Sequence, residues 1–183
     1  MKSKRPLSRS AAVLLIIVCS LLIIVAIRGD RGRRSPESAQ IRETYAGYAL
    51  TFPEGAAAQS LTELLAQTPY EEVAGDKQTW KEYDVSAFVP YLPLAETVTS
   101  VQSSPFNSEV VTYILFTNAE GEEFCQCYKG DTLTNQTVYD PASDTAYEIT
   151  ARKVTVYDDF HKTVENAGKP SSIFNFDKLL GRK

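Results

Sequence analysis

Hydrophobic residues are spread unevenly along this chain, and the longest uninterrupted apolar run lies close to its N-terminus. Residues 11–27 contain no charged side chain, and Ser20 is their only clearly polar residue. At about 1.5 Å per residue, a helix of this length is about 25 Å long, close to the thickness of the hydrocarbon core of a bilayer. A helix also pairs its backbone N–H and C=O groups internally, as lipid requires. The pattern predicts one transmembrane helix over residues 11–27, in contact with membrane lipid.

Basic residues flank this helix on both sides. Residues 1–10 and residues 28–34 each contain four lysines or arginines, so the positive-inside rule gives a tie. The free amino terminus adds one positive charge to the first segment, and ten residues are too few for an exported domain. We therefore expect residues 1–10 to form a basic cytoplasmic tail. The protein is then a single-pass protein of the cell membrane whose C-terminal domain is extracytoplasmic.

A cleaved signal peptide is the main alternative for this N-terminal region. Such peptides have an apolar stretch of about 7–15 residues followed by small residues at the cleavage site. The run here is longer, leads directly into Arg28, and is followed by no clear A-x-A site. An uncleaved anchor is therefore favoured, and a secreted domain is the alternative.

Beyond the apolar run, the composition divides the chain into a linker and a domain. Residues 28–42 are polar and rich in Gly, Ser, Arg and Pro, which predicts a flexible linker. Residues 43–183 are numerous enough for one domain with a hydrophobic core.

The first part of this domain alternates between apolar and polar positions and then becomes helical. The alternation over residues 45–52 predicts a strand that is buried on one face. Ser60 and Glu63 have the spacing of a capping box, and leucines at positions 61, 64 and 65 form an apolar stripe. We expect a helix there, and a second short helix over residues 70–74.

The second part of the domain reads as a series of strands. We expect breaks at residues 103–105, 118–121, 130–134 and 140–144, where turn-forming residues gather. Short connections favour pairing between sequence neighbours. The predicted fold class is therefore α+β, an antiparallel meander sheet covered by short helices. A helix over residues 158–166 and an apolar tail over residues 172–180, packed against the sheet, complete it. The predicted strands cover residues 97–102, 109–117, 122–128, 137–139, 145–149 and 153–157.

Four aromatic residues lie in a stretch without clear periodicity, which makes them candidates for binding a partner. Trp and Tyr combine a large apolar area with a polar tip, and are therefore common in protein interfaces. The alternative is that these side chains fill the core. The candidates are Trp80, Tyr83, Phe88 and Tyr91.

The charge distribution bears on the class of partner. The formal charge of −4 divides into +7 on residues 1–34 and −11 on residues 35–183. An acidic domain argues against binding to nucleic acid, because such binding requires cations that neutralise phosphates. A protein partner at the membrane is the expected one.

The candidate chemistry of the chain is limited. Cys125 and Cys127 are two apart in a predicted strand, which is unsuitable geometry for a disulfide, and His161 is the only histidine. Phosphate-binding glycine loops and the H-E-x-x-H and G-x-S-x-G motifs do not occur. We expect no metal, no cofactor and no catalytic activity, and predict an interaction or accessory module of a membrane complex. The alternative is an extracytoplasmic, hydrolase-like enzyme that uses loop carboxylates.

Overall fold

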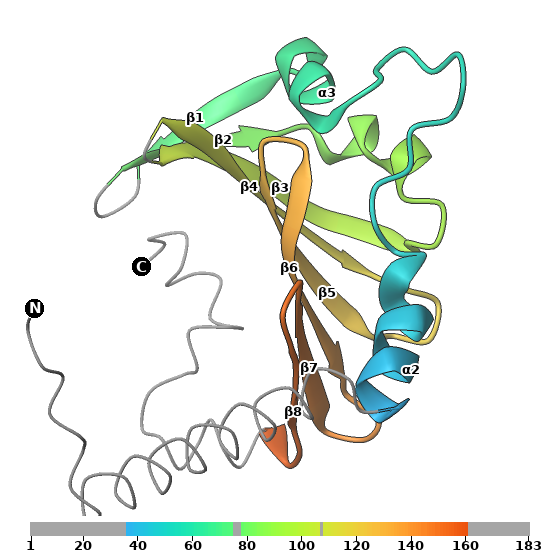
Figure 1. The fold of residues 1–183 in the computed structure, drawn as a ribbon. Helices are drawn as coiled ribbons and strands as arrows, with labels where there is room; N and C mark the ends of the chain where they lie inside the picture. The colour runs from blue at the N-terminus through green and yellow to red at the C-terminus, as the bar shows by residue number, and fades with distance from the viewer. Residues whose placement is uncertain (1–35, 75–77, 107, 161–183) are drawn as a thin grey trace, which may run out of the picture.

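Eight antiparallel strands, each paired with the next one in the sequence, form a single sheet. The computed structural model describes residues 36–74, 78–106 and 108–160 (Figure 1). The prediction of an α+β protein with an antiparallel meander is confirmed. The strands are β1 (Tyr70–Ala74), β2 (Thr79–Tyr83), β3 (Thr97–Phe106), β4 (Glu109–Thr117), β5 (Glu123–Lys129), β6 (Thr132–Asp140), β7 (Thr145–Thr150) and β8 (Val154–Tyr157).

In the part of the chain that the structure describes, four short helices accompany the sheet. Two are α-helices, α2 (Pro36–Ala46) and α3 (Leu61–Gln67), and two are 3-10 helices, η1 (Val85–Ala87) and η2 (Val89–Tyr91). None of these helices in the described ranges is long and apolar enough to cross a bilayer. The predicted transmembrane helix (residues 11–27) and the apolar tail (residues 172–180) lie outside the described residues, as does all but the start of the predicted helix at 158–166.

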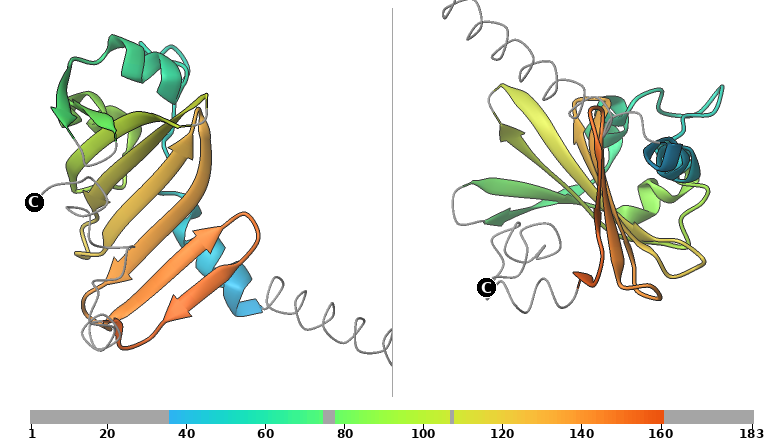
Figure 2. Two further views of the ribbon diagram at one scale, coloured as in Figure 1. Left: turned by 90° about the vertical axis from the view of Figure 1, so that its left-hand side faces the viewer. Right: turned by 60° about the horizontal axis from the view of Figure 1, so that its bottom comes forward.

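The helices lie on one face of the sheet, which we call the covered face; the opposite face is the open face. The left view of Figure 2 shows the sheet turned toward the reader with α2 behind it. Alternate strand residues point into the core on the covered face, because side chains alternate across a strand. They meet residues from the helices and from the segment between α2 and α3. The largest side chains of this core with almost no exposure are Leu61, Phe88, Val101, Ile114, Phe116 and Val138.

The prediction of a strand over residues 45–52 is wrong. Helix α2 extends to Ala46, and the chain then continues without regular structure to α3. The side chains of Tyr48, Leu50 and Phe52 nevertheless pack against the core, as the alternation indicated. The backbone here pairs with side chains of the sheet and, at Thr51, with the backbone oxygen of Tyr91 in η2, instead of with a neighbouring strand. The amide of Leu50, for example, donates to the hydroxyl of Tyr128 at 3.1 Å.

Helix α2 also includes residues 36–42, which the sequence analysis assigned to the linker. Ser38 and Tyr45 of this helix are buried, and Ile41 packs against the core. The helix therefore belongs to the folded unit. Its weak amphipathic pattern explains why the polar composition of the segment was read as a linker.

Helix α3 is confirmed, including its N-terminal cap. Ser60 accepts a hydrogen bond from the amide of Glu63 at 3.2 Å, and the Glu63 carboxylate accepts one from the amide of Gln59 at 2.8 Å. These bonds satisfy N–H groups that have no partner within the helix.

Three other predictions of local structure are wrong. Residues 70–74 form strand β1 rather than a helix, because they pair with β2 along their whole length. Strand β3 continues through the predicted break at 103–105 and pairs with β4 as far as Phe106. Strand β6 begins at Thr132, so only a tight turn remains of the loop predicted at residues 130–134.

Candidate functional site

A cavity of about 450 Å³ lies between α3 and the strands β1 to β4, and we call it the α3 pocket. Its volume lies in the range of about 300–1,000 Å³ that is typical of binding pockets. Most of the lining side chains are apolar or aromatic, and they come from α3, four strands and the turn between β5 and β6. The pocket is lined by Thr62, Leu65, Ala66, Tyr70, Lys81, Tyr83, Ser103, Pro105, Val110 and Gly130.

The position of α3 over the sheet is set by Asp131 in the turn between β5 and β6. One oxygen of this carboxylate, Oδ1, accepts hydrogen bonds from the amide of Thr62 at 2.8 Å and from its hydroxyl at 2.9 Å. A carboxylate at a helix N-terminus is favourable because the free N–H groups there carry partial positive charge. Gly130 adopts a φ of 53°, a conformation that favours glycine, and directs this turn toward the helix. Asp131 therefore holds α3, which covers the pocket, next to the C-terminal end of β5.

The polar groups of the pocket lie on β2 and β3. The hydroxyls of Tyr83 and Ser103 form a 3.0 Å hydrogen bond and are buried. The ammonium group of Lys81 lies 4.1 Å from the centre of the Tyr70 ring, within the distance for a cation–π interaction. A hydrogen bond with Tyr70 raises the pKa of Lys81. The pocket therefore has apolar walls and one permanent positive charge.

The rim of the α3 pocket exposes apolar surface beside a free strand edge. Tyr70 is 47% exposed and Val110 is 43% exposed, although both side chains are large and apolar. Tyr70 is the first residue of β1, which pairs only with β2 and therefore presents one edge without a strand partner in the part of the chain that the structure describes. Such an edge is a template for a further strand.

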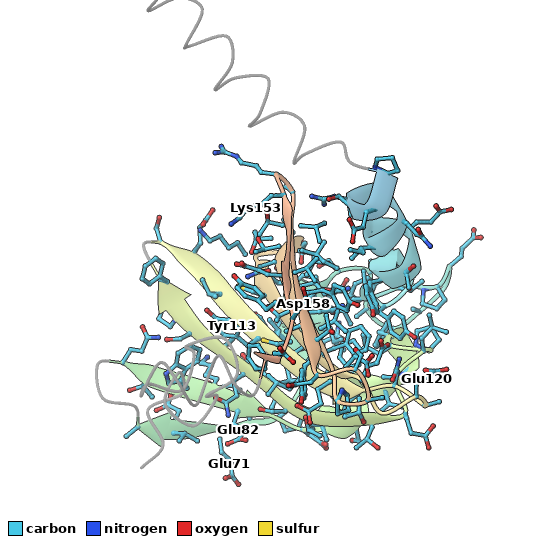
Figure 3. All side chains as sticks on the ribbon, turned by 90° about the horizontal axis from the view of Figure 1, so that it is seen from below. Glu71, Glu82, Tyr113, Glu120, Lys153 and Asp158 are labelled. Carbon is cyan, nitrogen blue, oxygen red and sulfur yellow. The ribbon has the colours of Figure 1, made fainter. Side chains whose placement is uncertain are left out.

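The strand β1 is acidic. Glu71 pairs with Glu82 of β2 across the sheet, and Glu72 pairs with Lys81. Figure 3 shows Glu71 and Glu82 close together at one end of the molecule and Lys153 at the other. Like charges placed directly opposite one another are unfavourable.

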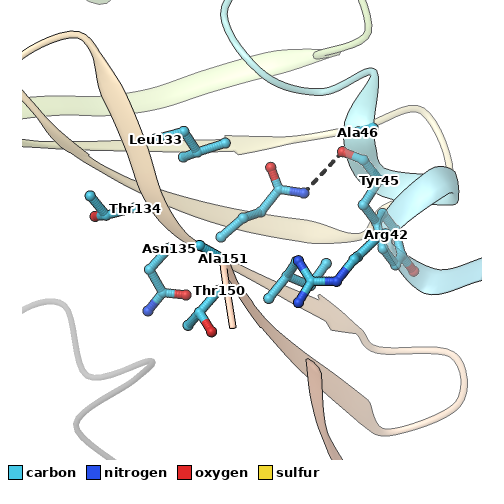
Figure 4. A pocket seen from close by; sticks show the side chains of 10 residues that line it. Arg42, Tyr45, Ala46, Leu133, Thr134, Asn135, Thr150 and Ala151 are labelled. Atoms are coloured by element: carbon cyan, nitrogen blue, oxygen red, sulfur yellow. Dashed lines mark hydrogen bonds between the residues drawn. The ribbon is translucent and has the colours of Figure 1, made fainter. Parts of the chain in front are cut away.

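A second, smaller cavity of about 180 Å³ lies between α2 and the strands β6 and β7 (Figure 4). Its size is below that of typical ligand sites. The amide group of Gln136 lies at this cavity and donates to the backbone oxygen of Tyr45 at 3.1 Å. Gln136 also accepts a hydrogen bond from Gln126 at 2.7 Å. We assign this cavity to the attachment of α2 to the sheet.

The four aromatic residues predicted to bind a partner are all buried. Tyr83, Phe88 and Tyr91 belong to the core of the covered face. Trp80 lies on the open face, where its ring is 5.9 Å from that of Tyr113. Of the four, Tyr83 lines the α3 pocket. Binding of a partner by these residues stays a prediction.

Two carboxylates at the turn between β6 and β7 accept hydrogen bonds from neighbouring groups. Asp140 accepts hydrogen bonds from the amide of Ala142 and the hydroxyl of Ser143, which lower its pKa. Asp144 accepts one from the hydroxyl of Tyr139 at 3.3 Å. Within residues 36–74, 78–106 and 108–160, no group of three or more His, Cys, Asp or Glu residues is arranged to hold a metal ion.

The two cysteines of β5 are free, as their spacing predicts. Both side chains point to the open face, because they alternate with the core residues Phe124 and Tyr128. Cys125 is buried, and this burial raises the pKa of its thiol to about 12, with a smaller contribution from Cys127. The thiol is protonated at neutral pH, which disfavours nucleophilic chemistry.

Comparison of the chain with models of protein families, with curated proteins and with solved structures gives no match. Sequence analysis missed Tyr70, Lys81 and Val110 as site residues. The apolar residues Tyr70, Val73 and Ala74 have the spacing of a helix rather than of a strand, so no local pattern marked Tyr70 as a strand residue beside the pocket.

Proposed function

We propose that this protein is a membrane-anchored, extracytoplasmic interaction module without catalytic activity, which holds a protein partner in a membrane complex. In this proposal residues 11–27 lie in lipid and the sheet domain lies outside the cytoplasm. The observation that carries the proposal is the α3 pocket, an apolar cavity whose exposed rim adjoins the free edge of β1.

The chemistry of this site suggests which segment of the partner it binds. An extended segment that adds a strand to β1 gains backbone hydrogen bonds, and pockets for alternate side chains give such binding its specificity. An apolar side chain of that segment fits the space between Leu65, Tyr70 and Val110. Lysine or arginine residues on the same segment complement the exposed carboxylate of Glu71 on the edge strand. The expected partner is a protein with an extended, basic and partly apolar segment.

The test compares two substitutions that add the same charge at different exposed valines. Val110→Glu places a carboxylate at the rim of the α3 pocket, whereas Val156→Glu places one on β8, at the other edge of the sheet. The full-length chain is expressed at its native level in its source cells and crosslinked mildly. Proteins recovered with each variant are then quantified against the unsubstituted chain.

We expect a specific set of crosslinked proteins to decrease at least about tenfold with Val110→Glu and to be retained with Val156→Glu, since buried charge at an interface is costly. Equal recovery with both variants would contradict a role for the α3 pocket. Recovery of this chain alone from unsubstituted cells would contradict the interaction function itself.

A further inference from the structure

The open face of the sheet lacks charge at its centre. Away from the turns, the central strands β3, β4 and β5 present only uncharged side chains to this face between positions 100 and 127. A sheet face in contact with water normally carries charged and polar residues. The residues are Ser100, Gln102, Ser104, Val111, Tyr113, Leu115, Cys125 and Cys127.

Several of these side chains are buried, although no described helix or strand lies over them. Gln102 is 1% exposed and Trp80 on β2 is 6% exposed. Val111 and Cys125 are also buried. The left view of Figure 2 shows this face without any described element in front of it. The face therefore has the character of one half of an interface.

Several buried polar groups of the open face lack hydrogen-bond partners, whereas Oγ of Ser104 donates to the backbone oxygen of Thr79 at 3.0 Å. Neither Nε2 nor Oε1 of Gln102 has one, and the same is true of Oγ of Ser100 and Oδ1 of Asn135. Figure 4 shows Asn135 beside Thr150, with both side chains directed away from α2. Buried polar groups are nearly always paired in native proteins, so these atoms require a partner.

The side chain of Gln102 specifies the kind of partner. A primary amide with a free donor and a free acceptor is complementary to a peptide group, which offers one C=O and one N–H. The uncharged side chains beside it on β3 and β4 favour an apolar segment, while its pairing partner on β2 is the charged residue Glu82. A polypeptide that crosses this face near Gln102 satisfies both requirements.

The described chain ends on this same face. After β8, the ring of Phe160 packs 5.4 Å from that of Tyr139, and its amide donates to the backbone oxygen of Asp144 at 2.9 Å. Tyr139 pairs with Ala146, and both are on the open face with Phe160. The chain beyond residue 160 therefore starts from one end of the open face.

We propose that the C-terminal segment, residues 161–183, lies across the open face and covers Trp80, Gln102 and the two cysteines. An extended chain spans about 3.3 Å per residue, and five strand spacings from β7 to β2 amount to about 24 Å. About eight residues are enough for that distance, so the segment is long enough. It carries the apolar residues that the face requires, Ile173, Phe174, Phe176, Leu179 and Leu180.

Alkylation of the native cysteines tests this proposal in the full-length chain in detergent. The double substitution Phe174→Glu and Phe176→Glu removes two apolar side chains and adds two charges. Its control, Ser171→Glu and Ser172→Glu, adds the same charges beside the apolar cluster. The rates at Cys125 and Cys127 are measured by mass spectrometry of the corresponding peptide.

We expect alkylation of Cys127 to be at least about tenfold faster in the phenylalanine variant than in the control, because opening the face removes its protection. Hydrogen exchange of the β4 and β5 amides distinguishes local opening from unfolding of the sheet. Equal alkylation rates in the two variants would overturn the proposal.

Disulfide scanning tests the proposal without disturbing the fold. Cys19 and Cys125 are replaced by serine, Cys127 is retained, and single cysteines are introduced at each position from 172 to 178. Oxidation is expected to give an intramolecular disulfide with Cys127 for at least one position. Disulfides formed only between two molecules would show that a second copy covers the open face. No disulfide at any position would indicate that another polypeptide covers it. Either result would overturn the proposal.

Discussion

The hydroxyl group of Tyr45 in α2 donates a 2.7 Å hydrogen bond to Oε1 of Glu122, which lies 77 positions later in the chain. The other carboxylate oxygen of Glu122 accepts a 2.8 Å bond from Asn118, whose amide also donates to the hydroxyl of Tyr48. Through these contacts, the turn between β4 and β5 holds the end of α2 on the covered face.

We expect Tyr45→Phe to lower the free energy of unfolding by about 1–3 kcal/mol, because a hydrogen bond to a charged group is lost in a partly buried place. Tyr147→Phe is a matched control, since its ring also packs against Tyr45 and its hydroxyl makes no hydrogen bond to another described residue. Urea unfolding of both variants measures the difference. A loss of similar size in the two variants would contradict the assigned role of the Tyr45–Glu122 bond.

The domain is expected to become less stable at alkaline pH. Burial raises the pKa of Cys125, Tyr113 and Tyr128 to about 12 each, above their usual values of 9.0 and 10.0. In the unfolded chain these groups lose their protons at lower pH, so the folded state binds more protons between about pH 9 and pH 12. Stability is therefore complete below pH 9 and is lost as the pH rises through this window, by up to about 1.4 kcal/mol per pH unit for the buried groups Cys125 and Tyr128 and by less for the half-buried Tyr113.

Unfolding by urea between pH 8 and pH 11 measures this dependence, and Cys125→Ala isolates one contribution. The variant is expected to show a smaller decrease in stability between pH 9 and pH 11 than the unsubstituted chain. An unchanged slope would indicate that the Cys125 thiol is more accessible than the structure shows.

Gln126 and Gln136 are expected to act as a unit. Gln126 donates to Gln136 and to the backbone oxygen of Tyr48, and it accepts from the hydroxyl of Tyr128. Replacing either glutamine by leucine leaves buried groups without partners, at a cost of about 1–3 kcal/mol for each group. The double variant should lose less stability than the sum of the two single variants, by about 1 kcal/mol or more. Additive losses in a double-mutant cycle would contradict the coupling.

Asp131→Ala is expected to loosen α3 without unfolding the sheet. The substitution removes two hydrogen bonds to Thr62, and losses of helix caps cost about 1 kcal/mol. Hydrogen exchange of residues 61–67 should accelerate, while exchange in β4 and β5 stays unchanged. Glu120→Ala, in the turn between β4 and β5, removes an exposed acid and serves as the control. Equal exchange of α3 in both variants would show that Asp131 does not hold this helix.

The sequence was sufficient to predict the parts of the fold that depend on local patterns. The stretch from Glu109 to Thr117 is apolar on both faces and forms β4 with the predicted ends. The cap formed by Ser60 and Glu63 was likewise predictable, because both of its groups lie within four residues. Residues 70–74, by contrast, contain two glutamates and an alanine, which favour helices. Pairing with β2 determines their conformation, and intrinsic preference is a weak guide in such a case.

The candidate site was harder to predict from the sequence than the fold was. The α3 pocket joins residues as distant as Thr62 and Gly130, and no single stretch contains more than a small part of its lining. The segment from Tyr45 to Phe52 shows a similar difficulty. Its alternation correctly indicated that Tyr48, Leu50 and Phe52 face the core, but it failed at the start, where Tyr45 is buried and Ala46 is exposed. Several of its backbone partners are glutamine and tyrosine side chains of β5 and β6. Alternation alone does not reveal these partners.

The strictly sequential order of the strands has a consequence for how the protein acquires its structure. Each strand pairs with the next strand in the sequence, so most contacts join residues that are close in the chain. Contacts of this kind favour fast folding. The sheet can therefore grow strand by strand as the polypeptide emerges, beginning at β1. Helix α2 is the exception, because its contacts with Glu122 and Gln136 do not exist until β5 and β6 are made. Pulse labelling during refolding should show β3 to β5 protected from exchange before α2, so that a helix synthesised before the sheet reaches its final position after it.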